Sequence, residues 1–199
     1  MLREMKYAFK AILIFTIILG FGYTFFITVF ASLLFNRQAN GSIISGENGK
    51  KGSVLIGQKF TVPRYFHPRP SNAGSKGYDP TASGGSNLAP TNRKLIDNVK
   101  SNLEQVLKDN PGFKPEDIPV DAVTSSASGL DPHISIENAK IQAPRVAKAR
   151  NLDLSVVHYL INNNTDKPLL FVQGEPGVNV LQLNLELDKV SKDISNERR

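Results

Sequence analysis

The stretch that decides the fold is AILIFTIILGFGYTFFITVFASLLF, residues 11–35. It lies within 26 consecutive residues, 11–36, that carry no charge. At 1.5 Å per residue, a helix of that length would run about 39 Å, and the hydrocarbon core of a bilayer is about 30 Å thick. Backbone groups in hydrocarbon find no water to bond, so a single spanning segment must be helical. We therefore predict one transmembrane helix over residues 11–35.

The charges on either side of this span predict its direction. Arg3, Lys6 and Lys10 precede it, whereas Arg37 is the only charge between the span and residue 47. The positive-inside rule then places residues 1–10 in the cytoplasm and everything after residue 35 outside. The alternative is a cleaved signal peptide, because residues 29–31 (VFA) form a passable cleavage site. The apolar run continues to residue 35, beyond the usual length of a signal peptide, which favours an uncleaved anchor.

The rest of the chain has the size and composition of one exported domain. The 199 residues include 24 basic and 18 acidic ones, and removing the charges before the span leaves 21 against 17. The absence of Cys excludes disulfides and thiolate metal sites. A modest positive charge without a basic, aromatic-rich face excludes nucleic acid and favours membrane lipid headgroups or a protein partner.

Composition also predicts the layout of this exported part. Gly, Asn and Ser dominate residues 36–52, which indicates a linker. A domain over residues 53–188 and a charged, frayed tail over residues 189–199 follow. The apolar run at 53–60 predicts a short buried strand. Residues 63–90 contain nine Pro and Gly, so no helix or central strand fits there, but four large side chains indicate an ordered, packed loop: Tyr65, Phe66, Tyr78 and Leu88.

Helix and strand patterns alternate after residue 90. Apolar residues recur every three or four positions from 96 to 107, predicting an amphipathic helix capped by Thr91 and ended at residues 110–112. Ser135 and Asp153 are predicted caps of two further helices, the first kinked or divided at Pro144. Residues 118–124 predict an extended segment, and alternating leucines predict a hairpin of residues 169–173 and 178–187. The fold class is a single N-terminal transmembrane helix plus one soluble mixed α/β domain.

No catalytic constellation emerges from the residues alone. Residues 46–53 lack the spacing of a phosphate-binding loop. Asp131 and His133 offer at most two metal ligands, so we expect no metal site, with the Asp capping a turn and the His hydrogen-bonded. The alternative function is a membrane-anchored extracytoplasmic serine hydrolase with Ser86 or Ser128 as nucleophile, although no G-x-S-x-G motif is present. A triad of Ser86, His133 and Asp131 is one conceivable arrangement. Residues 84–87 fit either an anion-binding backbone nest or a tight turn at Asn87.

A series of motifs in fixed order resembles the C subunit family, KdpC, of the Kdp potassium-transporting ATPase. The resemblance covers residues 1–188 behind the single span. The motifs that carry it are SxLIGQ from Ser53, YFxxRPS from Tyr65, SGGSNLxPTN from Ser83, SGLDPHIS from Ser128, QxxRVAxAR from Gln142 and GEPxVNVLxLN from Gly174.

The resemblance implies a non-catalytic accessory subunit of a bacterial inner-membrane complex that imports K⁺ at the expense of ATP. The implied partners are a channel-like potassium-binding subunit, a P-type ATPase subunit and a small single-span subunit. The family is described as a catalytic chaperone that raises the affinity of the ATPase subunit for ATP. That description implies ATP contact at a signature-like loop, formed here by Ser83, Gly84, Gly85, Ser86 and Asn87.

The flanking charges conflict with that ATP contact, because they place Ser83 outside the cell. We therefore expect a structural role, in which Gly20 and Gly22 let the helix pack closely between larger subunits. The external domain would cap the K⁺ entrance and dock through the loop of residues 63–90. The other predicted docking residues are Asp131, Pro132, His133, Arg145 and Arg150.

Overall fold

A computed structural model describes residues 1–46, 49–166 and 174–197. The chain consists of two compact units, residues 1–53 and residues 54–199. The first unit is a long apolar helix with a short hairpin, and the second is a domain of helices and one small sheet. The predicted fold class is confirmed.

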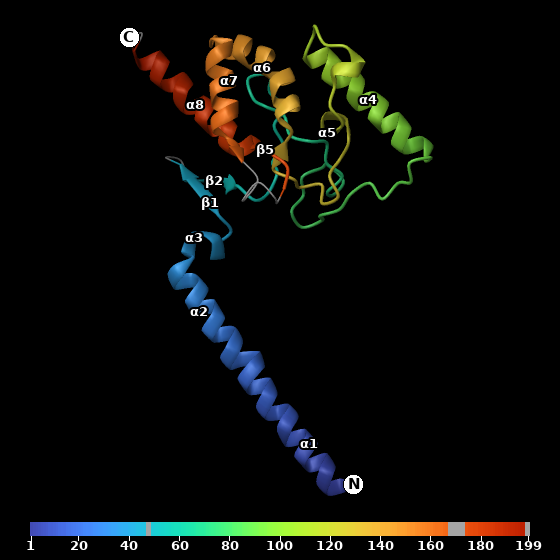
Figure 1. Cartoon of the computed structure of the whole chain (residues 1–199), viewed down its shortest axis with the longest axis vertical. Coiled ribbons are helices and arrows are strands. Elements are labelled where there is room, and N and C mark those ends of the chain that lie inside the picture. Colours follow the sequence, from blue (N-terminus) through green and yellow to red (C-terminus); the bar gives the residue numbers. More distant parts are fainter. Residues whose placement is uncertain (47–48, 167–173, 198–199) are drawn as a thin grey trace. The chain divides into compact units, whose positions relative to one another are not determined.

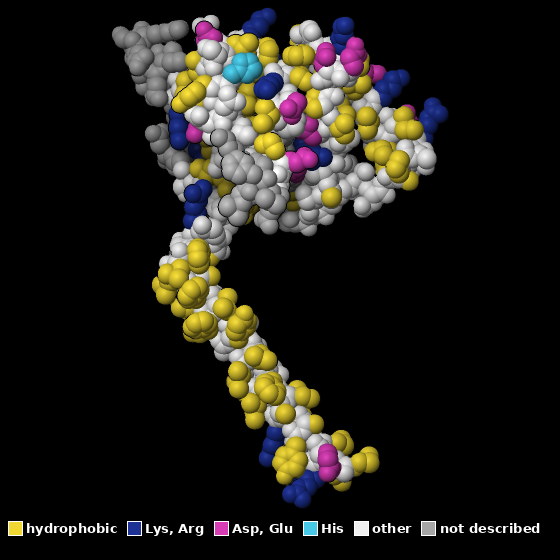
Figure 2. Space-filling model, viewed as in Figure 1, with side chains coloured by type: hydrophobic (Ala, Val, Ile, Leu, Met, Phe, Trp, Pro, Cys, Tyr) yellow, Lys and Arg dark blue, Asp and Glu magenta, His cyan; other side chains and the backbone are white. Residues whose placement is uncertain are grey.

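The first unit begins with a helix of 33 residues, Leu2–Leu34, long and apolar enough to cross a membrane. It comprises α1 (Leu2–Phe15), a π-helical segment η1 (Thr16–Tyr23) and α2 (Thr24–Leu34). Figure 2 shows hydrophobic side chains along this helix, none of them buried in the chain itself. The helix starts nine residues before the predicted span. Its polar Thr28 hydroxyl donates to the carbonyl of Thr24 at 2.8 Å, which satisfies the hydroxyl without water.

The residues predicted as a linker contain regular structure. A short helix α3 (Asn36–Ala39) is followed by an antiparallel hairpin of β1 (Ile43–Gly46) and β2 (Gly49–Ser53), as Figure 1 shows. The Ser42 N–H donates to the carbonyl of Arg37 at 2.8 Å, and the Ser53 hydroxyl donates to the carbonyl of Gly41 at 2.7 Å. The hairpin therefore returns the chain to the end of the apolar helix.

The core of the second unit lies among three helices: α6 (Ile136–Arg150), α7 (Leu154–Asn163) and α8 (Val180–Glu197). A small antiparallel sheet has the order β3 (His133–Ile134), β5 (Gly177–Asn179), β4 (Thr165–Asp166). Figure 1 shows the three helices grouped beside β5. The largest apolar side chains fully buried there are Phe66, Ile134, Ile161, Leu183, Leu187, Val146, Val157 and Val178.

The remaining helices lie on the other side of the second unit (Figure 1). They are α4 (Arg93–Asp109), the 3₁₀ turn η2 (Pro115–Asp117) and α5 (Val120–Val123). Between β2 and α4 runs the long loop, residues 54–92, which contains neither helix nor strand. The predicted absence of regular structure over residues 63–90 is confirmed, and so is its packing, because Phe66 and Ala73 are fully buried.

Two predicted strands are wrong. Ser53 ends β2, residues 54–56 form a turn, and residues 57–60 are neither helix nor strand. Gly57 packs against residues 130 and 131. Its N–H donates to the carbonyl of Leu130 at 2.8 Å, and an added Cβ would lie 2.6 Å from the carbonyl oxygen of Asp131. The extended segment predicted at 118–124 contains α5, whose first turn follows Pro119. Proline before a helical turn favours its start, because the preset φ fits the helix entry.

The predicted helix ends depend on local chemistry and are largely confirmed. Ser135 caps α6 by accepting from the N–H of Asn138 at 3.0 Å, and Asp153 caps α7 by accepting from that of Ser155 at 2.9 Å. The helix before residue 110 is capped by Asn92 in place of the predicted Thr91. Helix α6 runs through Pro144 without interruption, so no second helix begins there.

The predicted second strand of the C-terminal hairpin is wrong. Its first strand, residues 169–173, lies outside the described residues. Only Gly177–Asn179 is a strand, and α8 starts at Val180 and extends through the tail predicted to be frayed. The alternating leucines also satisfy helical spacing, since Leu183, Asn184 and Leu187 are all buried on one side of α8. Packing against α7 therefore decided between two patterns that the sequence left equally possible.

Candidate docking site

The long loop is held by side-chain amides from two helices. Asn184 of α8 accepts from the N–H of Phe66 at 2.8 Å and donates to the carbonyl of the same residue at 3.0 Å. Gln142 of α6 does the same for His67, at 2.7 and 3.0 Å. Each side-chain amide thus makes the two backbone hydrogen bonds that a neighbouring strand would make in a sheet. It satisfies one backbone N–H and one carbonyl of the loop.

Two predicted docking residues, Arg145 and Arg150, also hold this loop from α6. Arg145 donates to the carbonyls of Pro63 and Tyr65, the latter at 3.0 Å. Burial lowers the pKa of Arg145 to about 10. The fully buried side chain of Arg150 donates to the carbonyl of Arg64 at 2.6 Å and pairs with Asp188 at 2.8 Å. The donors of both arginines are therefore used inside the chain, and neither presents a free guanidinium to a partner.

The Asp131–His133 turn is built as a structural element. Asp131 accepts from the backbone N–H of His133 at 3.0 Å and pairs with Arg69 at 3.0 Å. The His133 ring lies 2.9 Å from the carboxylate of Asp166, and the carbonyl of Pro132 accepts from the N–H of Val180 at 3.0 Å. The expectation of a capped turn with a hydrogen-bonded His is confirmed. Among the described residues no three metal-binding side chains gather.

The loop of Ser83–Asn87 packs against residues 126–129. The carbonyl of Ser128 accepts from the Ser83 hydroxyl at 3.0 Å and from the Gly84 N–H at 2.8 Å. Gly85 passes so close to Ala127 that an added Cβ would lie 3.0 Å from its carbonyl oxygen. Asn87 takes a left-handed φ of 51°, as a tight turn requires. Two donors that a phosphate would need are thus occupied by the chain's own backbone.

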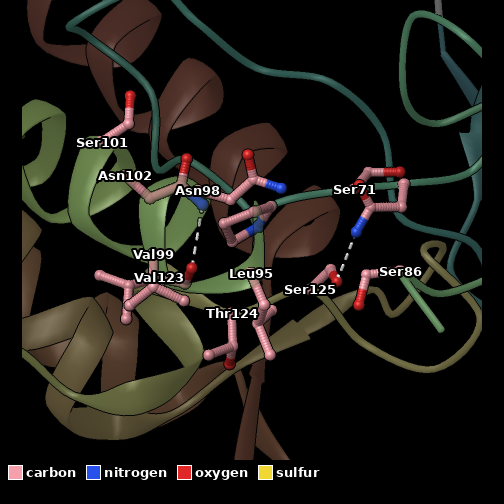
Figure 3. Close-up of a pocket in the computed structure, with 12 residues that line it drawn as sticks. Ser71, Ser86, Leu95, Asn98, Val99, Ser101, Asn102, Val123, Thr124 and Ser125 are labelled. Atoms are coloured by element: carbon pink, nitrogen blue, oxygen red, sulfur yellow. Dashed lines mark hydrogen bonds between the residues drawn. The ribbon is translucent and has the colours of Figure 1, made fainter. Parts of the chain in front are cut away.

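A cavity of about 260 Å³ opens beside this loop (Figure 3). It lies between α4, the residues after α5 and the long loop, and includes Ser86. Figure 3 shows the Asn102 amide donating to the Val123 carbonyl, at 2.9 Å, across the base. Hydroxyl, amide and aliphatic groups line the cavity, and none is charged: Pro70, Ser71, Asn72, Ser86, Leu95, Asn98, Val99, Ser101, Asn102, Val123, Thr124 and Ser125.

The apolar face of α4 beside the cavity is left partly open. This helix of 17 residues has no buried residue, and Ile96 is 53% exposed. Its other apolar side chains, from Leu95 to Leu107, are only half-buried. A helix with an apolar stripe owes most of its stability to packing of that stripe, so this face is suited to a further surface.

The predicted triad does not assemble in the described part of the chain. Ser86 lines the cavity, whereas both ring nitrogens of His133 face carboxylates, those of Asp131 and Asp166. No hydrogen bond joins Ser86 to His133 within the described residues. Ser86, singled out in the sequence, lines the cavity, whereas residues 131–133 are not among its lining residues. The α4 face was not predicted from the sequence as a docking surface. The signal available in the sequence was the apolar stripe of Ile96, Val99 and Leu103, which needs a surface to cover it.

Comparison with known proteins identifies the class of this fold and site. Residues 5–189 match the family described as KdpC, K⁺-transporting ATPase, c chain. A potassium-transporting ATPase KdpC subunit of Mycobacterium tuberculosis (strain H37Rv) is 48% identical over 190 residues, covering 96% of this chain and 100% of the relative. The subunit of the same name from Caldanaerobacter subterraneus is 49% identical over 185 residues, covering 93% and 94%. That of Caulobacter vibrioides is 48% identical over 189 residues, covering 94% of each.

The chain therefore belongs to the KdpC family. It is an accessory subunit of a potassium-transporting ATPase and not the catalytic one. The predicted resemblance is confirmed, and the serine hydrolase alternative has no support.

Proposed function

We propose that this chain is an assembly subunit that docks on the extracytoplasmic side of the potassium pump through α4 and the adjoining cavity. The observation that carries the proposal is an amphipathic helix of 17 residues that buries none of them in its own chain. The uncharged, hydroxyl-lined cavity beside it suits a protein surface better than a nucleotide, whose phosphates require cationic or backbone N–H donors.

The test compares two charged substitutions on exposed apolar residues. Ile96→Asp lies on the α4 face, and the control Tyr159→Asp lies on α7, where the ring is 64% exposed. Both variants should fold, because neither residue is buried. We expect Ile96→Asp to lose co-purification with the other pump subunits from membranes, and Tyr159→Asp to retain it. Equal recovery of the complex with both variants would contradict docking through α4.

The transmembrane helix is proposed to pack among the other subunits at Gly20 and Gly22. Beyond the adjoining helix backbone, the nearest atom of the described chain would lie 3.8 Å from a Cβ added at either position, so tertiary packing within the described chain does not require glycine there. We expect Gly22→Leu to leave the isolated subunit folded in detergent but to reduce recovery of the complex. Ile18→Leu, in the same segment, is the control. Unchanged recovery with Gly22→Leu would remove this packing site.

The orientation is proposed to be cytoplasmic at the N-terminus and extracytoplasmic after the span, as the flanking charges favour. The chain has no Cys, so Ser83→Cys gives a single thiol at an exposed position. We expect a membrane-impermeant maleimide to label it in whole cells. Labelling only after the inner face is exposed would reverse the orientation.

The catalytic-chaperone role and ATP contact at Ser83–Asn87 form a second proposal with its own test. A photoreactive ATP analogue should cross-link to these residues in intact membranes if they touch nucleotide. The occupied Ser83 and Gly84 donors favour the docking role instead. A cross-link in this loop, combined with labelling of Ser83→Cys only from inside, would replace docking by nucleotide binding.

A further inference from the structure

The turn that opens the long loop, residues 54–57, displays apolar side chains from a rigid base. At one end the carbonyl of Val54 accepts from the Asn179 amide at 2.8 Å. At the other end the N–H of Gly57 donates to the carbonyl of Leu130 at 2.8 Å. Between these fixed points Leu55 is 60% exposed and Ile56 is 37% exposed. Two large aliphatic side chains are therefore exposed on a turn whose two ends are hydrogen-bonded to the domain.

In the sequence this turn directly follows Ser53, the last residue of the hairpin that comes after the apolar helix. Ser42 is hydrogen-bonded to Arg37, and Ser53 is hydrogen-bonded to Gly41, only seven positions beyond the last residue of the helix. From Ser53 to Ile56 is three residues, which span at most about 11 Å. The second strand of the hairpin returns to where the first began, because Ser53 pairs with Ile43.

The charge of this part of the sequence matches a lipid surface. Residues 36–60 contain four basic residues and one acidic residue. Arg37 and Lys59, which flank the hairpin and the turn, both have exposed side chains. Apolar side chains flanked by cationic ones suit the boundary of a bilayer, where aliphatic groups enter the headgroup region and cations meet phosphates.

We propose that Leu55 and Ile56 insert into the interfacial region of the lipid bilayer, forming a second membrane contact in addition to the transmembrane helix. The occupant is phospholipid: aliphatic side chains about 5–10 Å deep in the headgroup and acyl boundary, with Arg37 and Lys59 at the phosphates. This contact involves neither α4 nor the cavity and so is independent of the docking proposal.

The absence of Trp from the chain permits a direct test. Leu55→Trp and the control Tyr159→Trp each place one indole at an exposed apolar position of the full chain. Each variant is reconstituted into phosphatidylcholine–phosphatidylglycerol vesicles, with or without bromine on the acyl chains. We expect brominated lipid to quench most of the fluorescence of Leu55→Trp and to leave that of Tyr159→Trp unchanged. Absence of quenching at position 55, or equal quenching at both positions, would overturn the proposal.

A second measurement separates lipid from a protein occupant in the assembled pump. A benzophenone amino acid at position 55 is irradiated in membranes that contain all subunits. We expect phospholipid adducts, recognised by a radiolabelled lipid precursor. An adduct with another subunit in place of lipid would overturn the proposal and assign the turn to a protein interface.

Discussion

The long loop is irregular but contributes to the core, whereas α4 is regular but contributes no buried residue. The loop has no helix or strand, yet it buries Phe66 completely and is anchored by side chains of α6 and α8. Helix α4 satisfies its own backbone and buries no residue. Regular backbone geometry and contribution to the core are therefore separate properties in this domain. The loop belongs to the interior, and the helix belongs to a surface.

The largest expected effect is the loss of Phe66 from the core. Phe66→Ala should reduce the free energy of unfolding by about 3–5 kcal/mol, since it leaves a cavity among α6, α7 and α8. Leu103→Ala in α4 is the comparison and should cost no more than about 1 kcal/mol, because the side chain is only half-buried. Urea unfolding of the detergent-solubilised chain measures both. A larger loss for Leu103→Ala would reverse the ranking of loop and helix.

Removal of the Asn184 side-chain amide, which bonds the backbone of Phe66, should have the next largest effect. Asn184→Ala leaves the N–H and carbonyl of the buried Phe66 without a partner, which should cost about 2–3 kcal/mol. Gln182→Ala, in the same helix, keeps those bonds and is the matched control. Amide hydrogen exchange of Phe66 reports the local effect. If the Phe66 amide is equally protected from hydrogen exchange in Asn184→Ala, the Asn184 side chain does not hold the loop.

A glycine pair separates backbone strain from crowding. Gly129 and Gly112 both have positive φ, 67° and 107°. A Cβ at Gly129 would lie 2.7 Å from Ala73 N and from the carbonyl oxygen of Gly84, whereas one at Gly112 meets nothing within 4 Å. We expect Gly112→Ala to cost about 1 kcal/mol and Gly129→Ala roughly twice that. Equal changes in Tm for the two variants would show that the loop around Ala73 and Gly84 can move to accommodate a Cβ at position 129 at little cost.

The smallest expected effect depends on pH and concerns His67. Burial and the nearby Arg145 lower the pKa of His67 below the ordinary value of 6.5, so the folded chain disfavours protonation of this ring. Below pH 6.5 the unfolded chain binds a proton that the folded chain resists, and stability falls as the solution is acidified. The fall in Tm across that range should be smaller in His67→Gln. An identical acid dependence in both proteins would exclude His67 as its source.

Short-range chemistry explains what could be predicted. Three predictions depended only on residues close together in the sequence, so they needed no knowledge of the fold. They are the apolar run before Arg37, the caps Ser135 and Asp153, and the irregular loop of residues 63–90. The motifs that resemble the KdpC family also lie in sequence order. The candidate site was predictable only in part: Ser86 was singled out in the sequence and lines the cavity, whereas the turn at Asp131 does not line it and the α4 face was not predicted.

Contacts between distant segments decided the rest. The spacing of the leucines in residues 181–187 fits a strand and a helix equally well, and the helix is the form that packs against α7. At Gly57 the close contact with Asp131 replaces the predicted strand. Arg145 and Arg150 look like surface cations in the sequence, yet the carbonyls of residues 63–65 take up their donors. Hydrophobic periodicity identifies the apolar face of a helix or strand. Only the tertiary structure shows whether other residues of the same chain pack against that face. In α4 the described residues of the chain leave the apolar face only partly covered.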